Sequence, residues 1–126
     1  MTIATDDFLR RSRALVSALG LLQRSQPDSE GYKGFRRKLE KCVKLVTGNA
    51  NGLLREAVRL PDAPNREMLE RAQERGLLDA EEVARWSGYF EGILPGDGVA
   101  YTEDTLTRLR SFAVDVHSLE KTLRRA

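Results

Sequence analysis

The 126-residue chain has one cysteine, one histidine and no long apolar run. Cys42 has no second cysteine to pair with, so a disulfide framework and a cysteine-based zinc site are both excluded. With only His117, the chain also lacks a catalytic histidine pair and a histidine cluster for a metal ion. No glycine-rich segment matches a Walker or dinucleotide-binding fingerprint. The sequence therefore predicts neither a metal site nor a bound cofactor.

The chain also has no segment with the roughly 20 consecutive apolar residues needed to cross a bilayer. Its first residues carry acids and lack the apolar core of a signal peptide. Hydrophobic residues make up 40% of the chain and charged residues 32%, as in soluble globular proteins. We therefore expect a cytoplasmic protein that does not contact membranes, with residues 1–126 forming a single domain.

Apolar residues recur at alternating steps of three and four through residues 30–60. They are Phe35, Leu39, Cys42, Val46, Ala50, Leu53, Ala57 and Leu60. This spacing places them on one face of a helix of about eight turns, and other helices must cover that face. Two glycines and two asparagines in residues 47–52 cost this helix about 3 kcal/mol relative to alanine. Because the spacing keeps its phase there, we predict one continuous helix, with Gly48 and Gly52 as points where another backbone approaches closely.

Four other helices are predicted around this one. A long helix ends near Arg24, with Thr5 as its N-cap, and Pro27 lies in the loop that follows. After residues 61–64, a short helix is capped by Asp62 or Asn65 and stops at Gly76.

The spacing of Asp79 and Glu82 is typical of a capping box at the start of a second short helix. A last long helix starts at residues 102–104 and has basic residues at its end. No segment alternates like a β-strand. The predicted fold class is all-α, an antiparallel helical bundle of three long and two short helices.

Charge is unevenly distributed along the chain. Residues 30–60 have a net charge of +5 and residues 61–104 a net charge of −7. The basic residues cluster in the first half of the long helix: Lys33, Arg36, Arg37, Lys38, Lys41 and Lys44. Such a cluster can bind phosphate, including RNA, or an acidic partner. The alternative is a solvated helix flank that the acidic segment of the same molecule neutralises.

Arg110 and His117 form the only candidate catalytic pair. They are seven residues apart, which places both side chains on one face of a continuous helix, about two turns apart. An arginine that holds phosphate and a histidine that transfers a proton would suit a ribonuclease. The alternative is a boundary histidine beside Val116, because sixteen arginines place one near any histidine by chance.

The order of features after Pro64 resembles the C-terminal half of HEPN-type helical bundles. The resemblance is carried by residues 64–69 (PNREML), 74–79 (ERGLLD), 83–90 (VARWSGYF), and Tyr101 before Glu103 and Asp104. Residues 36–58 also look like that family's long helix. The chain is most similar to HepT-like proteins and to the substrate-binding partners of minimal nucleotidyltransferases.

The resemblance implies a helical bundle, often dimeric, whose active members are ribonucleases with an Arg-x(4-6)-His motif. Residues 91–101 contain neither arginine nor histidine, so this motif is missing. Tyr101 resembles the tyrosine that follows the motif, which the partner nucleotidyltransferase modifies in some members.

Two functional hypotheses follow. The first is a non-catalytic interaction protein that binds a protein partner, such as a nucleotidyltransferase, or forms a homodimer, in the manner of a toxin–antitoxin pair. Its candidate partner surface consists of Trp86, Tyr89, Phe90 and Tyr101. The second is a ribonuclease that uses Arg110 and His117, or an RNA-binding bundle that does not cut RNA. Its candidate RNA contacts are Lys33, Arg36, Arg37, Lys41 and Lys44.

Overall fold

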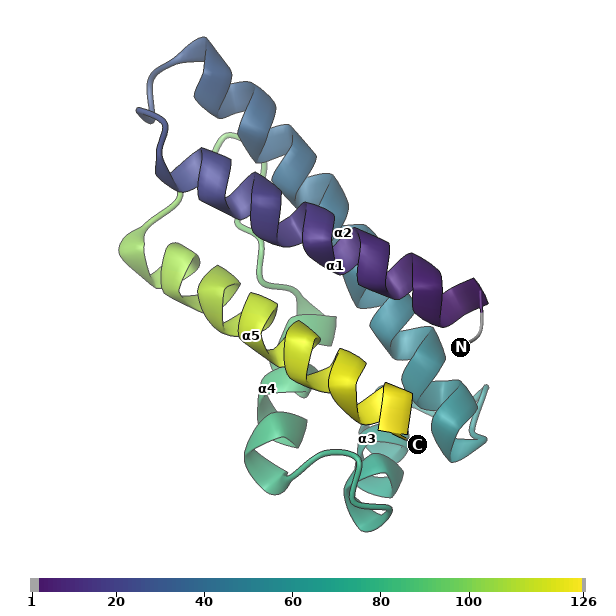
Figure 1. Cartoon of the computed structure of the whole chain (residues 1–126). Coiled ribbons are helices and arrows are strands. Elements are labelled where there is room, and N and C mark those ends of the chain that lie inside the picture. The colour runs from purple at the N-terminus through teal and green to yellow at the C-terminus, as the bar shows by residue number, and fades with distance from the viewer. Residues whose placement is uncertain (1–2, 126) are drawn as a thin grey trace.

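The computed structural model describes residues 3–125, which form five helices (Figure 1). They are α1 (Ile3–Gln23), α2 (Glu30–Val58), α3 (Asn65–Glu74), α4 (Ala80–Glu91) and α5 (Glu103–Arg125). No strand occurs between residues 3 and 125. This confirms the all-α prediction of three long and two short helices.

Helix α2 is the central element of the fold. It is continuous over 29 residues and contacts each of the other four helices. Figure 1 shows that α1 and α2 run antiparallel, and that α5 runs antiparallel to α1. The short helices α3 and α4 return the chain to the start of α5, so α2 and α5 run in the same direction.

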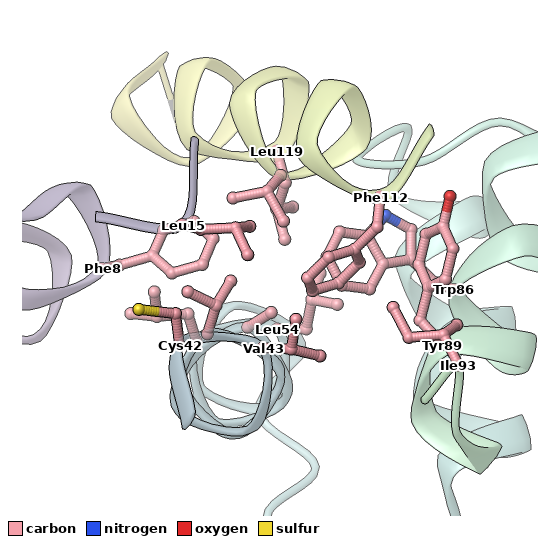
Figure 2. Close-up of a cluster of buried hydrophobic side chains, with 14 of the residues drawn as sticks. Phe8, Leu15, Cys42, Val43, Leu54, Trp86, Tyr89, Ile93, Phe112 and Leu119 are labelled. Carbon is pink, nitrogen blue, oxygen red and sulfur yellow. The ribbon is translucent and has the colours of Figure 1, made fainter. Parts of the chain in front are cut away.

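The hydrophobic core lies where α1, α2, α4 and α5 meet (Figure 2). Its largest fully buried side chains include Phe8 and Leu15 from α1, Leu54 from α2, Trp86 from α4 and Phe112 from α5. Cys42 belongs to this core. The spacing of three and four along α2 therefore marks the face that the other helices bury.

The predicted start of the first long helix and the predicted end of the second need correction by two to three residues. Helix α1 begins at Ile3, so Thr5 lies inside the helix and is not its N-cap. Helix α2 ends at Val58, two residues before Leu60. Pro61 disfavours a helical conformation at Leu60, and Arg59 takes a left-handed conformation, with φ 58°.

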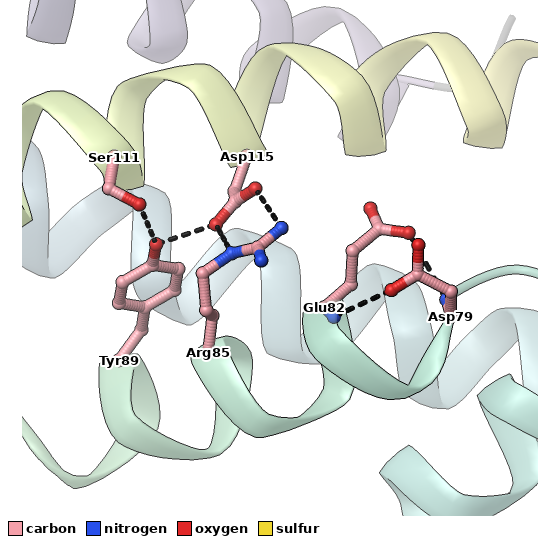
Figure 3. Close-up of polar contacts among 6 residues, drawn as sticks. All are labelled: Asp79, Glu82, Arg85, Tyr89, Ser111 and Asp115. Atoms are coloured by element: carbon pink, nitrogen blue, oxygen red, sulfur yellow. Dashed lines mark hydrogen bonds and ion pairs between the residues drawn. The ribbon is translucent and has the colours of Figure 1, made fainter.

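The start of α3 also differs from the prediction. Its N-cap is Pro64, which has no side-chain hydrogen bond, whereas Asn65 is the first helical residue. The Asn65 side chain instead accepts hydrogen bonds from Asn51 and Arg55 of α2, at 2.9 and 2.8 Å. The capping box of Asp79 and Glu82 is confirmed (Figure 3).

Gly76 ends α3 as predicted. It has a φ of 75°, a left-handed conformation that favours glycine, and lies just after the C-cap Arg75.

The prediction that Gly48 and Gly52 admit another backbone is wrong. Both glycines are exposed, and a Cβ atom added at either one would have no neighbour within 4 Å. Their cost in helix propensity is therefore not offset by a close backbone contact. Burial of the opposite face, with Val46, Ala50 and Leu53, keeps α2 helical through this segment.

Candidate functional site

Two of the four aromatic residues expected at a partner surface lie in the core. Trp86 is completely buried and Tyr89 is 5% exposed (Figure 2). The Trp86 ring lies 5.2 Å from that of Tyr89 and 5.9 Å from that of Phe112, both edge-on. Trp86 is therefore not accessible to a partner, and Tyr89 has only a small exposed part. Phe90 and Tyr101 are half-buried and reach the surface.

A polar cluster joins α4 to α5 beside this aromatic core (Figure 3). Arg85 donates two hydrogen bonds to the buried carboxylate of Asp115, from Nε at 2.7 Å and from Nη2 at 3.0 Å. The Tyr89 hydroxyl donates to the same carboxylate at 2.6 Å and lies 3.0 Å from Ser111 Oγ. The hydrogen bond to Asp115 raises the pKa of the Arg85 guanidinium further above its ordinary value. The cluster stays charged and fully paired, as expected of a structural link between helices.

We expect Tyr89 to make stability depend on pH in the alkaline range. Burial, followed by the hydrogen bond to Asp115, raises the pKa of Tyr89 from 10.0 to about 12. The folded-state pKa therefore exceeds the unfolded-state pKa. The contribution is complete below pH 10, decreases as the pH rises from 10 to about 12, and is lost above that.

Urea unfolding between about pH 9 and pH 11 should show a shallower loss of stability in Tyr89→Phe than in the wild type. Equal slopes in the two proteins would contradict this assignment. The pH dependence of Tyr101→Phe should differ from that of the wild type in the same direction, because burial and the hydrogen bond to Glu40 also raise the pKa of Tyr101.

Tyr101 holds the connection between α4 and α5 against α2. Its hydroxyl donates a hydrogen bond to Glu40 at 2.7 Å. The Arg36 guanidinium lies over the Tyr101 ring, 4.4 Å from its centre, and also donates to Glu40 at 3.2 Å. Tyr101 and Arg36 therefore contact each other, and both donate hydrogen bonds to Glu40. These contacts explain why neither side chain projects freely toward a partner.

The remaining predicted RNA-contact residues lie on one exposed stripe of α2. At 3.6 residues per turn, Lys33, Arg37, Lys41 and Lys44 point in the same direction, and Arg36 does not. All four side chains are exposed. Lys33 is 3.8 Å from Glu30 of its own helix. Among the described residues, no carboxylate lies within ion-pair distance of Arg37, Lys41 or Lys44. The acidic segment, residues 61–104, therefore forms no ion pair with these three.

The stripe leads into an apolar groove between α2 and the end of α4. Val43, Lys44, Thr47 and Gly48 form one side of the groove, and Tyr89, Phe90, Gly92, Ile93 and Leu94 form the other. Its volume is about 330 Å³. Val43, Tyr89 and Ile93 are buried and form its floor, and Figure 2 shows these three side chains as members of the core cluster. The absence of a side chain at Gly48 leaves the groove open on the α2 side.

The candidate catalytic pair is not brought together in a site. Arg110 is exposed and donates to Thr107 of its own helix at 3.2 Å. His117 is exposed and lines a separate hollow between α1 and α5, with Arg13, Glu120, Lys121 and Arg124 among its neighbours. The lining of that hollow does not include Arg110. The two side chains share a face of α5, about 10 Å apart along the helix axis.

Two further findings concern metal ions and membranes. Within the described part of the chain, no group of three histidine, cysteine or carboxylate side chains is arranged to hold a metal ion. None of the described helices is long and apolar enough to span a membrane.

Comparison of the chain with models of protein families, with curated proteins and with solved structures finds no match. The structure establishes an all-α protein of five packed helices, and the resemblance to HEPN-type bundles stays a prediction.

Proposed function

We propose that this chain is a non-catalytic interaction protein that binds an acidic protein partner through α2. The observation that supports this is the stripe of Arg37, Lys41 and Lys44, which is exposed and has no ion pair within the described chain. An unpaired row of like charges repels itself unless anions or a partner neutralise it. Complementary charge on a partner would speed association and fix its orientation.

The resemblance to HepT-like proteins makes a nucleotidyltransferase the first partner class to test. The fold is compatible with such a partner. Helix α2 packs against the other four helices through a different face, and the basic stripe stays exposed. Phe90 is the more exposed of the two aromatic residues beside this stripe, because Tyr89 is 5% exposed, and Trp86 is completely buried.

The proposal is tested by affinity purification of the tagged full-length chain from its source cell. Three proteins are compared: the wild type, Lys41→Glu/Lys44→Glu, and the control Arg108→Glu/Lys121→Glu. The control changes the same amount of charge at two exposed positions of α5. We expect a stoichiometric protein partner with the wild type and the control. The α2 variant should lose it, because reversing two contacts each worth about 1 kcal/mol or more weakens binding at least tenfold.

RNA binding is the second candidate, and the same unpaired stripe favours it. Treatment of the eluate with ribonuclease separates the two. A protein partner that survives the treatment supports the first proposal. Recovery of RNA alone, released steeply by salt, would replace the first proposal with the second.

A further inference from the structure

We propose that the groove beside Gly48 is the socket for an apolar side chain of an amphipathic helix whose adjacent edge is acidic. This inference rests on the proposed function. It names the contact that makes partner binding through α2 specific. It joins two features that are separate in the sequence: the basic stripe of α2 and the apolar pocket at the end of α4.

The two features are contiguous because of helix geometry. Arg37, Lys41, Lys44 and Gly48 follow one another at steps of four, three and four, so they form a single row along α2, about 16 Å long. Lys44 belongs to both the stripe and the groove. A helix lying along this row would run for about three turns. Its acidic residues would face Arg37 and Lys41, and an apolar residue would face the groove.

The groove has the chemistry of a small anchor site. Its floor consists of Val43, Tyr89 and Ile93, whose side chains are almost entirely buried. Half-buried Phe90 and Leu94 form the outer wall. A volume of about 330 Å³ lies at the small end of the range for ligand pockets and suits one or two apolar side chains.

The two side-chain hydroxyls that line the groove already have hydrogen-bond partners. The Tyr89 hydroxyl donates to Asp115, and the Thr47 hydroxyl donates to the carbonyl of Val43 at 2.6 Å. An apolar side chain can therefore enter without leaving these hydroxyls unpaired. The only charged side chain that lines the groove is Lys44, which favours an acidic neighbour and disfavours a basic one.

Gly48 offers a selective test because its replacement should not damage the fold. A Cβ atom there would meet nothing within 4 Å, and the same is true of Gly52, one turn later in the same helix. Leucine at either position improves helix propensity, which favours the folded state of both variants. Gly48→Leu partly fills the groove, whereas Gly52→Leu is the matched control, because Gly52 does not line it.

The probe is a fluorescent amphipathic peptide of about 15 residues, with leucines at i, i+4 and i+7 and glutamates along one edge. A twin peptide carries lysines in place of the glutamates. Fluorescence anisotropy should show that the wild type and Gly52→Leu bind the acidic peptide equally. Binding by Gly48→Leu should be at least about tenfold weaker, as for the loss of an anchor contact. The lysine twin should bind the wild type at least about tenfold more weakly than the acidic peptide.

Each other result overturns a defined part of the proposal. If Gly48→Leu binds like Gly52→Leu while Lys41→Glu weakens binding, the socket is wrong and the proposed function survives. If both peptides bind equally, the acidic edge is wrong. If neither binds the wild type, the socket and its acidic occupant are both wrong. If sedimentation shows a wild-type dimer that Gly48→Leu dissociates, the occupant is a second copy of this chain.

Discussion

Replacing Arg85 with alanine is expected to destabilise the protein by about 3 kcal/mol. The substitution leaves the carboxylate of Asp115, which is 4% exposed, without the one cationic partner that it has among residues 3–125. Removing one member of a buried ion pair typically costs about 3 to 5 kcal/mol, because the other charge stays buried and uncompensated. The lower end of this range applies to Arg85, since its side chain is 39% exposed and water can approach the vacated space.

Urea unfolding, followed by circular dichroism, measures this loss. Arg66→Ala is the matched control, because Arg66 pairs with Glu70 at 3.2 Å while its side chain is 91% exposed. An exposed pair of this kind contributes about 0.5 kcal/mol or less. A loss for Arg85→Ala that does not exceed the loss for Arg66→Ala would show that the α4–α5 ion pair adds nothing to stability.

The continuity of α2 was predictable from its sequence. The apolar spacing from Val46 through Ala50 to Leu53 keeps the helical phase, and the energy of burying this face outweighs the propensity cost of two glycines. The same spacing could not show what lies opposite Gly48 and Gly52. Open space lies there, and at Gly48 this space is the groove beside the end of α4.

The burial of Trp86 and Tyr89 has a signal in the local sequence. They are three residues apart, a spacing that places both side chains on one apolar face of α4 directed into the core. Asp115 has a comparable signal, because it lies among the core residues Phe112, Val116 and Leu119 of α5. An acidic residue on an apolar face predicts a buried partner, but its identity as Arg85, 30 residues earlier, depends on how α4 packs against α5.

The groove beside Gly48 was not predictable from local sequence. Its two sides come from residues 43–48 and 89–94, which become neighbours only when α3 and α4 fold back along α2. The basic stripe on α2 was predictable, since it depends only on helical periodicity. The absence of an ion pair between Arg37, Lys41 or Lys44 and the described acidic segment was not, because that depends on how residues 61–104 fold against α2.

Replacing Trp86 with alanine is expected to have the largest effect, a loss of about 4 kcal/mol. Truncating a fully buried aromatic side chain removes its transfer energy and leaves a cavity, and such changes cost about 3 to 5 kcal/mol. Trp86 is 0% exposed and lies between the rings of Tyr89, Phe90 and Phe112. Alanine would therefore weaken the junction of α4 with α5, and with it one wall of the groove.

Trp86→Phe tests whether packing alone accounts for this effect. The indole Nε1 of Trp86 is buried and has no hydrogen-bond partner within the described structure. Leaving a buried donor unpaired costs about 1 to 3 kcal/mol, and phenylalanine relieves that cost while keeping most of the aromatic contact. The loss for Trp86→Phe should therefore be about 1 kcal/mol or less, far below that for alanine.

Trp86 is the only tryptophan, so circular dichroism must follow the unfolding of both variants. Val114→Ala, at a position that is 65% exposed, should change stability by no more than about 0.5 kcal/mol and serves as the control. Equal losses for the phenylalanine and alanine variants would mean that the indole makes a contact that phenylalanine cannot replace. Relief of the unpaired Nε1 would then not offset the lost packing, which contradicts the small loss expected for phenylalanine.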